Sequence, residues 1–269
     1  MLTRGVVIAL LFLLTLDCDL AFAEPPSLKD GPLGMKFVSL PKGMFYMGWD
    51  GDKAKVKKTE IKAGFDMAIH LVTQGQWQEL MGKNPSQFSR KAGQADKVKA
   101  ISDEDLKDFP VDNVSWNDAQ EFIKKLNEMQ QGKGYQYRLP TDEDWEYACR
   151  GAATTEEECS YHFYVDAPTN DFSSKQANFD GNTPFGKGDK GPSLGRTSKV
   201  GSYPPNKLGL YDMHGNLWQW TDTLQPSSRG LRGGSWFNEA SACRAGFRSR
   251  HAPSNREDDR GFRLVRVRM

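Results

Sequence analysis

The stretch RGGSWFNEASACRAGFRSRHAPSNREDDRGFR, from Arg232 to Arg263, holds seven arginines, one cysteine and no lysine. The bias extends beyond it, because all 21 lysines of the chain lie at or before Lys207 and 10 of the 15 arginines lie at or after Arg229. Arginine presents a rigid planar fork of donors, whereas lysine carries a mobile point charge. The stretch therefore predicts a C-terminal region organised by fixed hydrogen-bond networks.

Three helices are predicted upstream from their start and stop signals. Thr73 is a plausible N-cap for a helix that Gly82 stops. Ser115 opens a second helix through a capping box with Asp118, and an apolar stripe follows it. A third helix is predicted from Thr141 to Gly151, and it opens with the same kind of capping box. Short strands are predicted at Met35–Leu40, Met44–Gly48 and Tyr135–Leu139.

The region from Gly151 to Leu208 has no sustained period and is rich in glycine, proline, aspartate and asparagine. A loop this long inside a compact domain is usually functional or held in place. Oxygen-bearing side chains suit Ca²⁺. On spacing alone, a calcium-held loop and a metal-free loop with solvated aspartates stay equally open.

The N-terminus has the pattern of a secretory signal peptide over residues 1–23, with cleavage after Ala23. The apolar run Gly5–Leu16 is too short to span a bilayer, and no later run could do so. We expect a flexible lead-in over 24–34 and one domain over 35–269, in a secreted or periplasmic protein. Three cysteines, Cys149, Cys159 and Cys243, would remain, with one disulfide or none. A formal charge of +1 does not indicate that the chain binds nucleic acid.

Four ordered blocks carry a family resemblance over about residues 35–268. They are PVDNVSW (Pro110–Trp116), YRLPT with WEYACRG (Tyr137–Thr141 and Trp145–Gly151), GLYDMHGNLWQW (Gly209–Trp220), and RGGSW with GFR (Arg232–Trp236 and Gly261–Arg263). The chain resembles the sulfatase-modifying-factor domain, the family of formylglycine-generating enzymes. The resemblance implies an α+β fold, a single mixed domain with little regular secondary structure, similar to C-type lectins.

The resemblance also implies structural calcium. One site would use the side chains of Asp212 and Gln219 with the backbone carbonyls of Gly215 and Leu217. Gln219 stands where the family often has glutamate, which lowers the charge of that site. A second site would use the side chain of Asn178 and the carbonyl of Phe179. His214, inside the third block, is predicted to have a packing role.

Enzymes of the family oxidise a sulfatase cysteine to formylglycine with O₂ and Cu(I) held by two thiolates. Soft sulfur ligands select Cu(I), so the chemistry requires the pair. Cys243 matches the second family cysteine, but the first falls at Asn238, and an amide is a poor Cu(I) ligand. The two-thiolate site therefore cannot form from this segment alone.

The other residues of this segment predict a substrate groove whose centre lacks the copper-binding cysteine pair. Cys243 and Ser235 are the candidate catalytic residues, and the groove would be formed by Trp218, Asn238, Arg232 and Arg248. The alternative for the arginines is structural pairing with Glu239, Glu257, Asp258 and Asp259.

The sequence predicts a binding or accessory member of the family, acting on an exported protein or peptide such as a sulfatase. Two alternatives stay open: an active oxidase, and a lectin-fold module that binds proteins or glycans. Calcium is the expected structural ion, and copper is disfavoured by Asn238.

Overall fold

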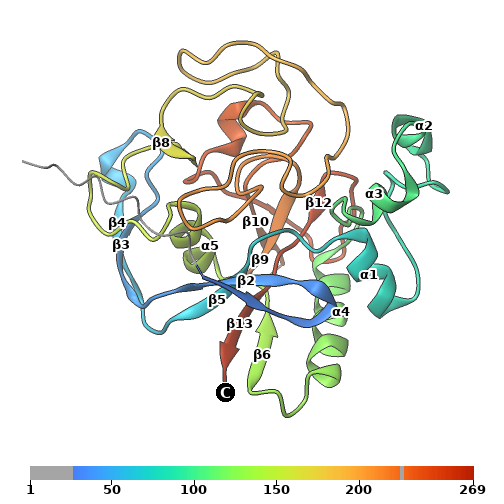
Figure 1. The fold of residues 1–269 in the computed structure, drawn as a ribbon. Helices are drawn as coiled ribbons and strands as arrows, with labels where there is room; N and C mark the ends of the chain where they lie inside the picture. The colour runs from blue at the N-terminus through green and yellow to red at the C-terminus, as the bar shows by residue number, and fades with distance from the viewer. Residues whose placement is uncertain (1–26, 225–226) are drawn as a thin grey trace, which may run out of the picture.

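A five-stranded antiparallel sheet places the last strand of the chain inside it. Its order is β1 (Leu28–Asp30), β2 (Lys36–Leu40), β5 (Phe65–Ala68), β13 (Val265–Arg268) and β6 (Tyr135–Arg138). The computed structural model describes residues 27–224 and 227–269 (Figure 1), so the predicted signal peptide and its cleavage site lie outside the described residues. Among the described residues, no helix has the length and apolar character needed to cross a bilayer.

A second sheet brings the third and fourth sequence blocks together. Its order is β11 (Ser249–His251), β10 (Arg229–Arg232), β9 (Trp218–Leu224) and β12 (Arg260–Gly261). The β9–β12 pair is parallel, and the other two pairs are antiparallel. Two ribbons complete the strands, β3 (Gly43–Met47) with β4 (Lys57–Ile61), and β7 (Phe163–Val165) with β8 (Ala167–Thr169). Short 3₁₀ turns are η1 (Pro32–Gly34), η2 (Lys53–Lys55) and η3 (Ala240–Cys243).

The three predicted helices are present with the predicted caps. They are α1 (Gln74–Met81), α4 (Trp116–Met129) and α5 (Asp142–Cys149), and capping boxes are formed at Thr73, Ser115 and Thr141. The sequence did not predict two shorter helices, α2 (Ala95–Val98) and α3 (Asp103–Lys107). Figure 1 shows α1, α2 and α3 grouped at one side of the molecule, with α4 beside β6.

The predicted flexible lead-in is a sheet strand in the part that the structure describes. Leu28–Asp30 pairs with β2, Lys29 forms an ion pair with Asp66 at 3.0 Å, and Arg266 donates to the carbonyl of Asp30 at 2.9 Å. These long-range bonds order the segment, and its polar composition gave no signal for them.

Aromatic stacking holds the long loop between residues 151 and 208, whose only strands are β7 and β8. Phe163 stacks on Phe172 with centroids 4.0 Å apart, and Phe172 stacks on Phe179 at 5.3 Å. All three rings are fully buried, and they enclose Cys243 and Ala240 of η3. The loop is therefore anchored by its own apolar core, which packs directly against the C-terminal segment.

Candidate functional site

Two arginines of the C-terminal segment, Arg232 and Arg248, converge on two carboxylates of α5. Arg232 is fully buried and forms ion pairs with Glu146 and, at 3.1 Å, with Asp142. Arg248 pairs with the same two residues at 2.9 and 2.7 Å and keeps 39% of its side chain exposed. The predicted alternative of structural pairing holds for both arginines, but its partners were wrong. The partner carboxylates belong to a helix about 90 residues upstream, which lies next to the arginines only in the folded chain.

Glu146 is the centre of this network. It also accepts from Arg150 at 2.8 Å and from the backbone N–H of Gly48 at 2.6 Å. Burial alone would raise the pKa of Glu146, but the charges of Arg150, Arg232 and Arg248 hold it at about 2. The guanidinium of Arg232 is therefore committed to the scaffold, and only Arg248 presents part of its side chain to solvent.

Ser235, Asn238 and Cys243 lie close along the chain, and the first two pair through their side chains. The Ser235 hydroxyl donates to the Asn238 side-chain oxygen at 2.7 Å. Cys243 has no exposed surface and packs in the phenylalanine cluster. Gly234 adopts a positive φ of 71°, and a Cβ there would lie 2.5 Å from the Cys243 sulfur. Burial raises the pKa of the Cys243 thiol to about 12, so the thiolate is scarce at neutral pH.

The other two cysteines are also free and buried, so the described chain contains no disulfide. His214 lies between Cys149 and Cys243. Its Nε2 accepts from the backbone N–H of Tyr164 at 2.9 Å and lies 3.5 Å from the Cys149 sulfur. Its Nδ1 therefore carries the proton and donates to the Cys243 carbonyl at 2.7 Å. Burial lowers the pKa of His214 to about 4, so the imidazole is neutral and has the packing role that the sequence predicted.

A two-thiolate Cu(I) centre does not fit these residues. Cys243 is enclosed by apolar side chains, Asn238 stands where the second sulfur is needed, and Cys149 is separated from Cys243 by the His214 ring. Within residues 27–224 and 227–269, no group of three or more His, Cys, Asp or Glu side chains could hold a metal ion. Cys243 therefore does not form the thiolate pair that the resemblance requires with either Asn238 or Cys149.

The calcium set of the third block contains one residue that does not fit as a ligand. The Gln219 amide oxygen accepts from Trp145 Nε1 at 2.8 Å and from Arg263 Nε at 2.7 Å. Its nitrogen donates to the Asp212 carbonyl at 2.7 Å. The amide cannot flip without placing donor against donor, so its oxygen stays directed at Arg263. Asp212 accepts from the backbone N–H of Gly201 at 3.0 Å, and Gly215 and Leu217 contribute only carbonyls to the predicted set.

The second predicted calcium set contains a free buried oxygen. The side-chain oxygen of Asn178 has no hydrogen-bond partner although the residue is 2% exposed. Its amide nitrogen donates to the Arg196 carbonyl at 3.0 Å, which fixes the orientation. A buried oxygen without a donor suits a hard cation, so Asn178 and the neighbouring carbonyl of Phe179 fit calcium better than the Gln219 set does.

Trp218 opens β9 and is 6% exposed, with its ring 6.0 Å from that of Phe247 and its backbone N–H bonded to the Asp259 carbonyl at 2.9 Å. Trp218 and Arg232 lie on the paired strands β9 and β10 and are buried, whereas Asn238 and Arg248 lie outside these strands and keep part of their surface exposed.

An acidic and aromatic face beside the predicted groove was missed by sequence reasoning. Trp236 packs edge-on against Phe88 at 5.4 Å and donates its indole N–H to the Asp258 carbonyl at 3.2 Å. Phe237 is 69% exposed and lies 5.6 Å from the Trp236 ring. The tryptophan of the fourth block was a possible signal, but its partners come from segments 22 and about 150 residues away.

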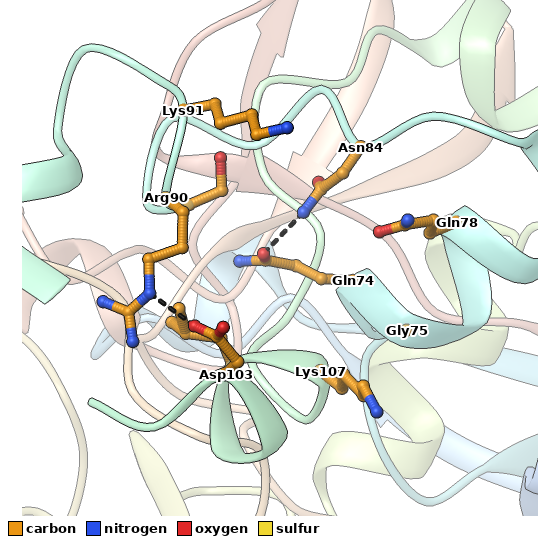
Figure 2. A pocket seen from close by; sticks show the side chains of 10 residues that line it. Gln74, Gly75, Gln78, Asn84, Arg90, Lys91, Asp103 and Lys107 are labelled. Carbon is orange, nitrogen blue, oxygen red and sulfur yellow. Dashed lines mark hydrogen bonds and ion pairs between the residues drawn. The ribbon is translucent and has the colours of Figure 1, made fainter. Parts of the chain in front are cut away.

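A cavity of about 430 Å³ lies elsewhere, between α1 and α3 (Figure 2). Its polar side chains bond one another: Asn84 donates to Gln74 at 2.8 Å, and Arg90 donates to Asp103 at 2.5 Å. None of the predicted site residues lines it.

Comparison with known proteins agrees with this architecture. The sequence model of the sulfatase-modifying factor enzyme 1-like domain matches residues 23–268. The chain is 35% identical over 169 residues to an inactive C-alpha-formylglycine-generating enzyme 2 of Bos taurus, covering 59% of this chain and 50% of that protein. It is 28% identical over 244 residues to the chaperone protein LppX of Paenibacillus barcinonensis, covering 78% and 82%. The solved structure of PvdO from Pseudomonas aeruginosa aligns with a TM-score of 0.66 at 23% identity, covering 90% and 98%.

The fold and the family match thus define a formylglycine-generating-enzyme-like domain of α+β class with little regular secondary structure, as the sequence predicted. The chain belongs to the sulfatase-modifying factor enzyme 1-like family. It spans about half the length of the first curated relatives it matches.

Proposed function

We propose that this chain is an exported accessory member of the family, which binds a protein or peptide and does not carry out copper-dependent oxidation. The observation that carries the proposal is the state of Cys243, a single thiol without exposed surface and with a pKa of about 12. Similarity to an inactive family member and to a chaperone protein also supports an accessory role. A sulfatase-like partner is the natural candidate because the named activity of other relatives is formylglycine generation.

The direct test incubates the purified chain with Cu(I), O₂ and a CxPxR-type peptide and measures thiol loss and aldehyde gain by mass spectrometry. We expect no aldehyde. Aldehyde formation by the wild-type chain that is lost in Cys243→Ser would overturn the accessory proposal and establish the oxidase alternative.

A second test asks whether the missing thiol alone explains the expected lack of oxidase activity. Asn238→Cys restores the sulfur but leaves Cys243 behind Gly234 and the phenylalanine cluster. We expect Asn238→Cys to bind Cu(I) no better than Asn238→Ser, as measured by competition with a chromogenic Cu(I) chelator. Tight binding by the cysteine variant would mean that a usable copper groove survives.

We retain calcium as a proposed structural ion at Asn178 and Phe179. A chelator should lower the melting temperature of the wild-type chain by several degrees, because an ion that binds only the folded state stabilises it. Asn178→Ala should abolish this shift, whatever its own stability. A wild-type melting temperature unaffected by chelation and by added Ca²⁺ would remove the proposal.

Export is proposed from the predicted signal peptide. Expression in a secreting host should give a mature chain that begins at Glu24, read by N-terminal sequencing. A cell-associated chain that retains Met1 would contradict it.

A further inference from the structure

The cavity between α1 and α3 has a basic lining. Arg90, Lys91 and Lys107 line it together with a single acid, Asp103 (Figure 2). Its volume of about 430 Å³ falls within the range of about 300–1,000 Å³ that is typical of ligand pockets. A lining with three cations and one anion favours a negatively charged ligand.

Two backbone carbonyls hold the Arg90 guanidinium in a fixed orientation. Its Nη1 donates to the Val98 carbonyl at 2.8 Å, and its Nη2 donates to the Ile101 carbonyl. Val98 is fully buried in an apolar cluster, which fixes this anchor. The Nε–H of Arg90 points to Asp103, which accepts it at 2.5 Å. The guanidinium therefore presents a pre-arranged donor to a carboxylate.

Asp103 is held only weakly at this position. Its side chain is 80% exposed and that of Arg90 is 37% exposed. Exposed ion pairs contribute little to stability, because water and salt screen the charges. A carboxylate from another molecule can therefore replace Asp103 beside Arg90 without disturbing the fold.

Further donors lie around Arg90. Lys91 is exposed, has no ion-pair partner within residues 27–224 and 227–269, and extends toward Asn84 in Figure 2. Asn84 is half-buried and donates one amide hydrogen to Gln74 at 2.8 Å. Its amide nitrogen carries a second hydrogen, which is left for a ligand. The cavity thus combines a fixed guanidinium, an unpaired ammonium and an amide donor.

We propose that this cavity binds the carboxylate side chain of a glutamate or aspartate in a bound peptide, with Arg90 and Lys91 as its charged contacts. Asp103 takes the place of that carboxylate when no peptide is bound. The proposal rests on the proposed peptide-binding function and names a class of side chain that the peptide carries. The side-chain amides of Asn84 and Gln78, which also line the cavity, match the peptide groups on either side of the acidic residue.

The site is tested with the synthetic tripeptide acetyl-Gly-Glu-Gly-amide, its neutral glutamine analogue, and acetate. Binding is followed by NMR through the Nε–H resonance of Arg90, which is assigned by its loss in Arg90→Lys. We expect a dissociation constant on the order of 1 mM for the glutamate tripeptide with the wild-type chain, and about tenfold weaker binding of the glutamine tripeptide and of acetate.

Asp103→Asn should tighten glutamate-tripeptide binding about two- to fivefold, because it removes the competing carboxylate and keeps the shape of the side chain. Asp96→Asn is the matched control, since Asp96 is an exposed acid in the first turn of α2 that does not line the cavity. It should behave as wild type.

Lys91→Met should weaken binding of the glutamate tripeptide about two- to fivefold. It alters an exposed side chain, so it tests the site independently of Asp103→Asn. Unchanged backbone amide spectra without peptide would show that each variant folds.

Absence of glutamate-tripeptide binding, equal binding of the glutamine tripeptide, or equal affinities of wild type and Lys91→Met would overturn the proposal. Acetate that binds as tightly as the glutamate tripeptide would overturn the assignment to a peptide. These outcomes are separate from those of the oxidation assay. Aldehyde formation would end the accessory proposal and leave the carboxylate site intact, whereas tripeptides that bind without charge preference would end the carboxylate site alone.

Discussion

The buried charge network around Glu146 allows a sharp stability prediction. Glu146→Gln keeps the shape of the side chain and removes its charge. Arg150 and Arg232 are both fully buried; Arg150 would then keep only neutral acceptors, and Arg232 would keep only Asp142 as an acidic partner. Removing one partner of a buried ion pair costs about 3–5 kcal/mol, because an uncompensated charge stays in the interior.

The pKa of Glu146 gives an independent magnitude. It lies at about 2, against 4.5 for the unperturbed side chain. Because the folded-state pKa is depressed, the contribution is fully present above pH 4.5 and is lost as the pH falls through 2. The difference corresponds to about 3 kcal/mol at neutral pH and to about 1 kcal/mol at pH 3.

The assay is urea unfolding followed by tryptophan fluorescence at pH 7 and pH 3. At pH 7 we expect Glu146→Gln to lose about 3–5 kcal/mol, or roughly 10 °C in melting temperature. The gap should shrink by about 2 kcal/mol at pH 3. Glu143→Gln, an exposed change on the same helix, is the control and should stay near wild type. A Glu146→Gln variant within 1 kcal/mol of wild type at pH 7 would refute the reasoning.

Three further predictions follow from buried groups. Cys243 should resist iodoacetamide at pH 8 in the native chain and react on unfolding, because its pKa is about 12; rapid native labelling, seen by peptide mapping, would contradict its burial. Burial raises the pKa of Asp112 to about 8, so the folded state holds a proton that the unfolded state releases, and stability falls as the pH rises from about 4 to 8. Asp112→Asn should therefore be more stable than wild type by about 1–3 kcal/mol at pH 8 and similar at pH 4; parallel pH profiles from urea titrations would count against this. Gly234→Ala should cost about 2–4 kcal/mol by thermal melting, because a Cβ would meet the Cys243 sulfur at 2.5 Å; a wild-type melting temperature would disprove that contact.

Local signals gave the helices because each cap satisfies backbone donors within four residues. The capping boxes at Ser115 and Thr141 form as predicted, and the N-cap predicted at Thr73 is also part of a capping box. The lead-in was misjudged because β1 is ordered by Asp66 and Arg266, which are distant in sequence.

In the candidate site, too, local sequence signals predicted the kind of interaction but not the distant partners. The arginine-only segment correctly indicated fixed networks, because guanidinium groups without lysines imply pre-arranged acceptors. The segment could not indicate that these acceptors lie on α5.

The position of β13 has a consequence for how the molecule is made. This strand lies between β5 and β6, yet residues 265–268 leave the ribosome after every other strand that the structure describes. Until they emerge, β5 and β6 each have an unpaired edge facing the place that β13 will fill, and unpaired edges invite association with other chains. Closure of this sheet is therefore a late event in the life of each new chain. A nascent chain stalled before residue 265 should be open to proteases and holding chaperones, and the completed chain should be resistant.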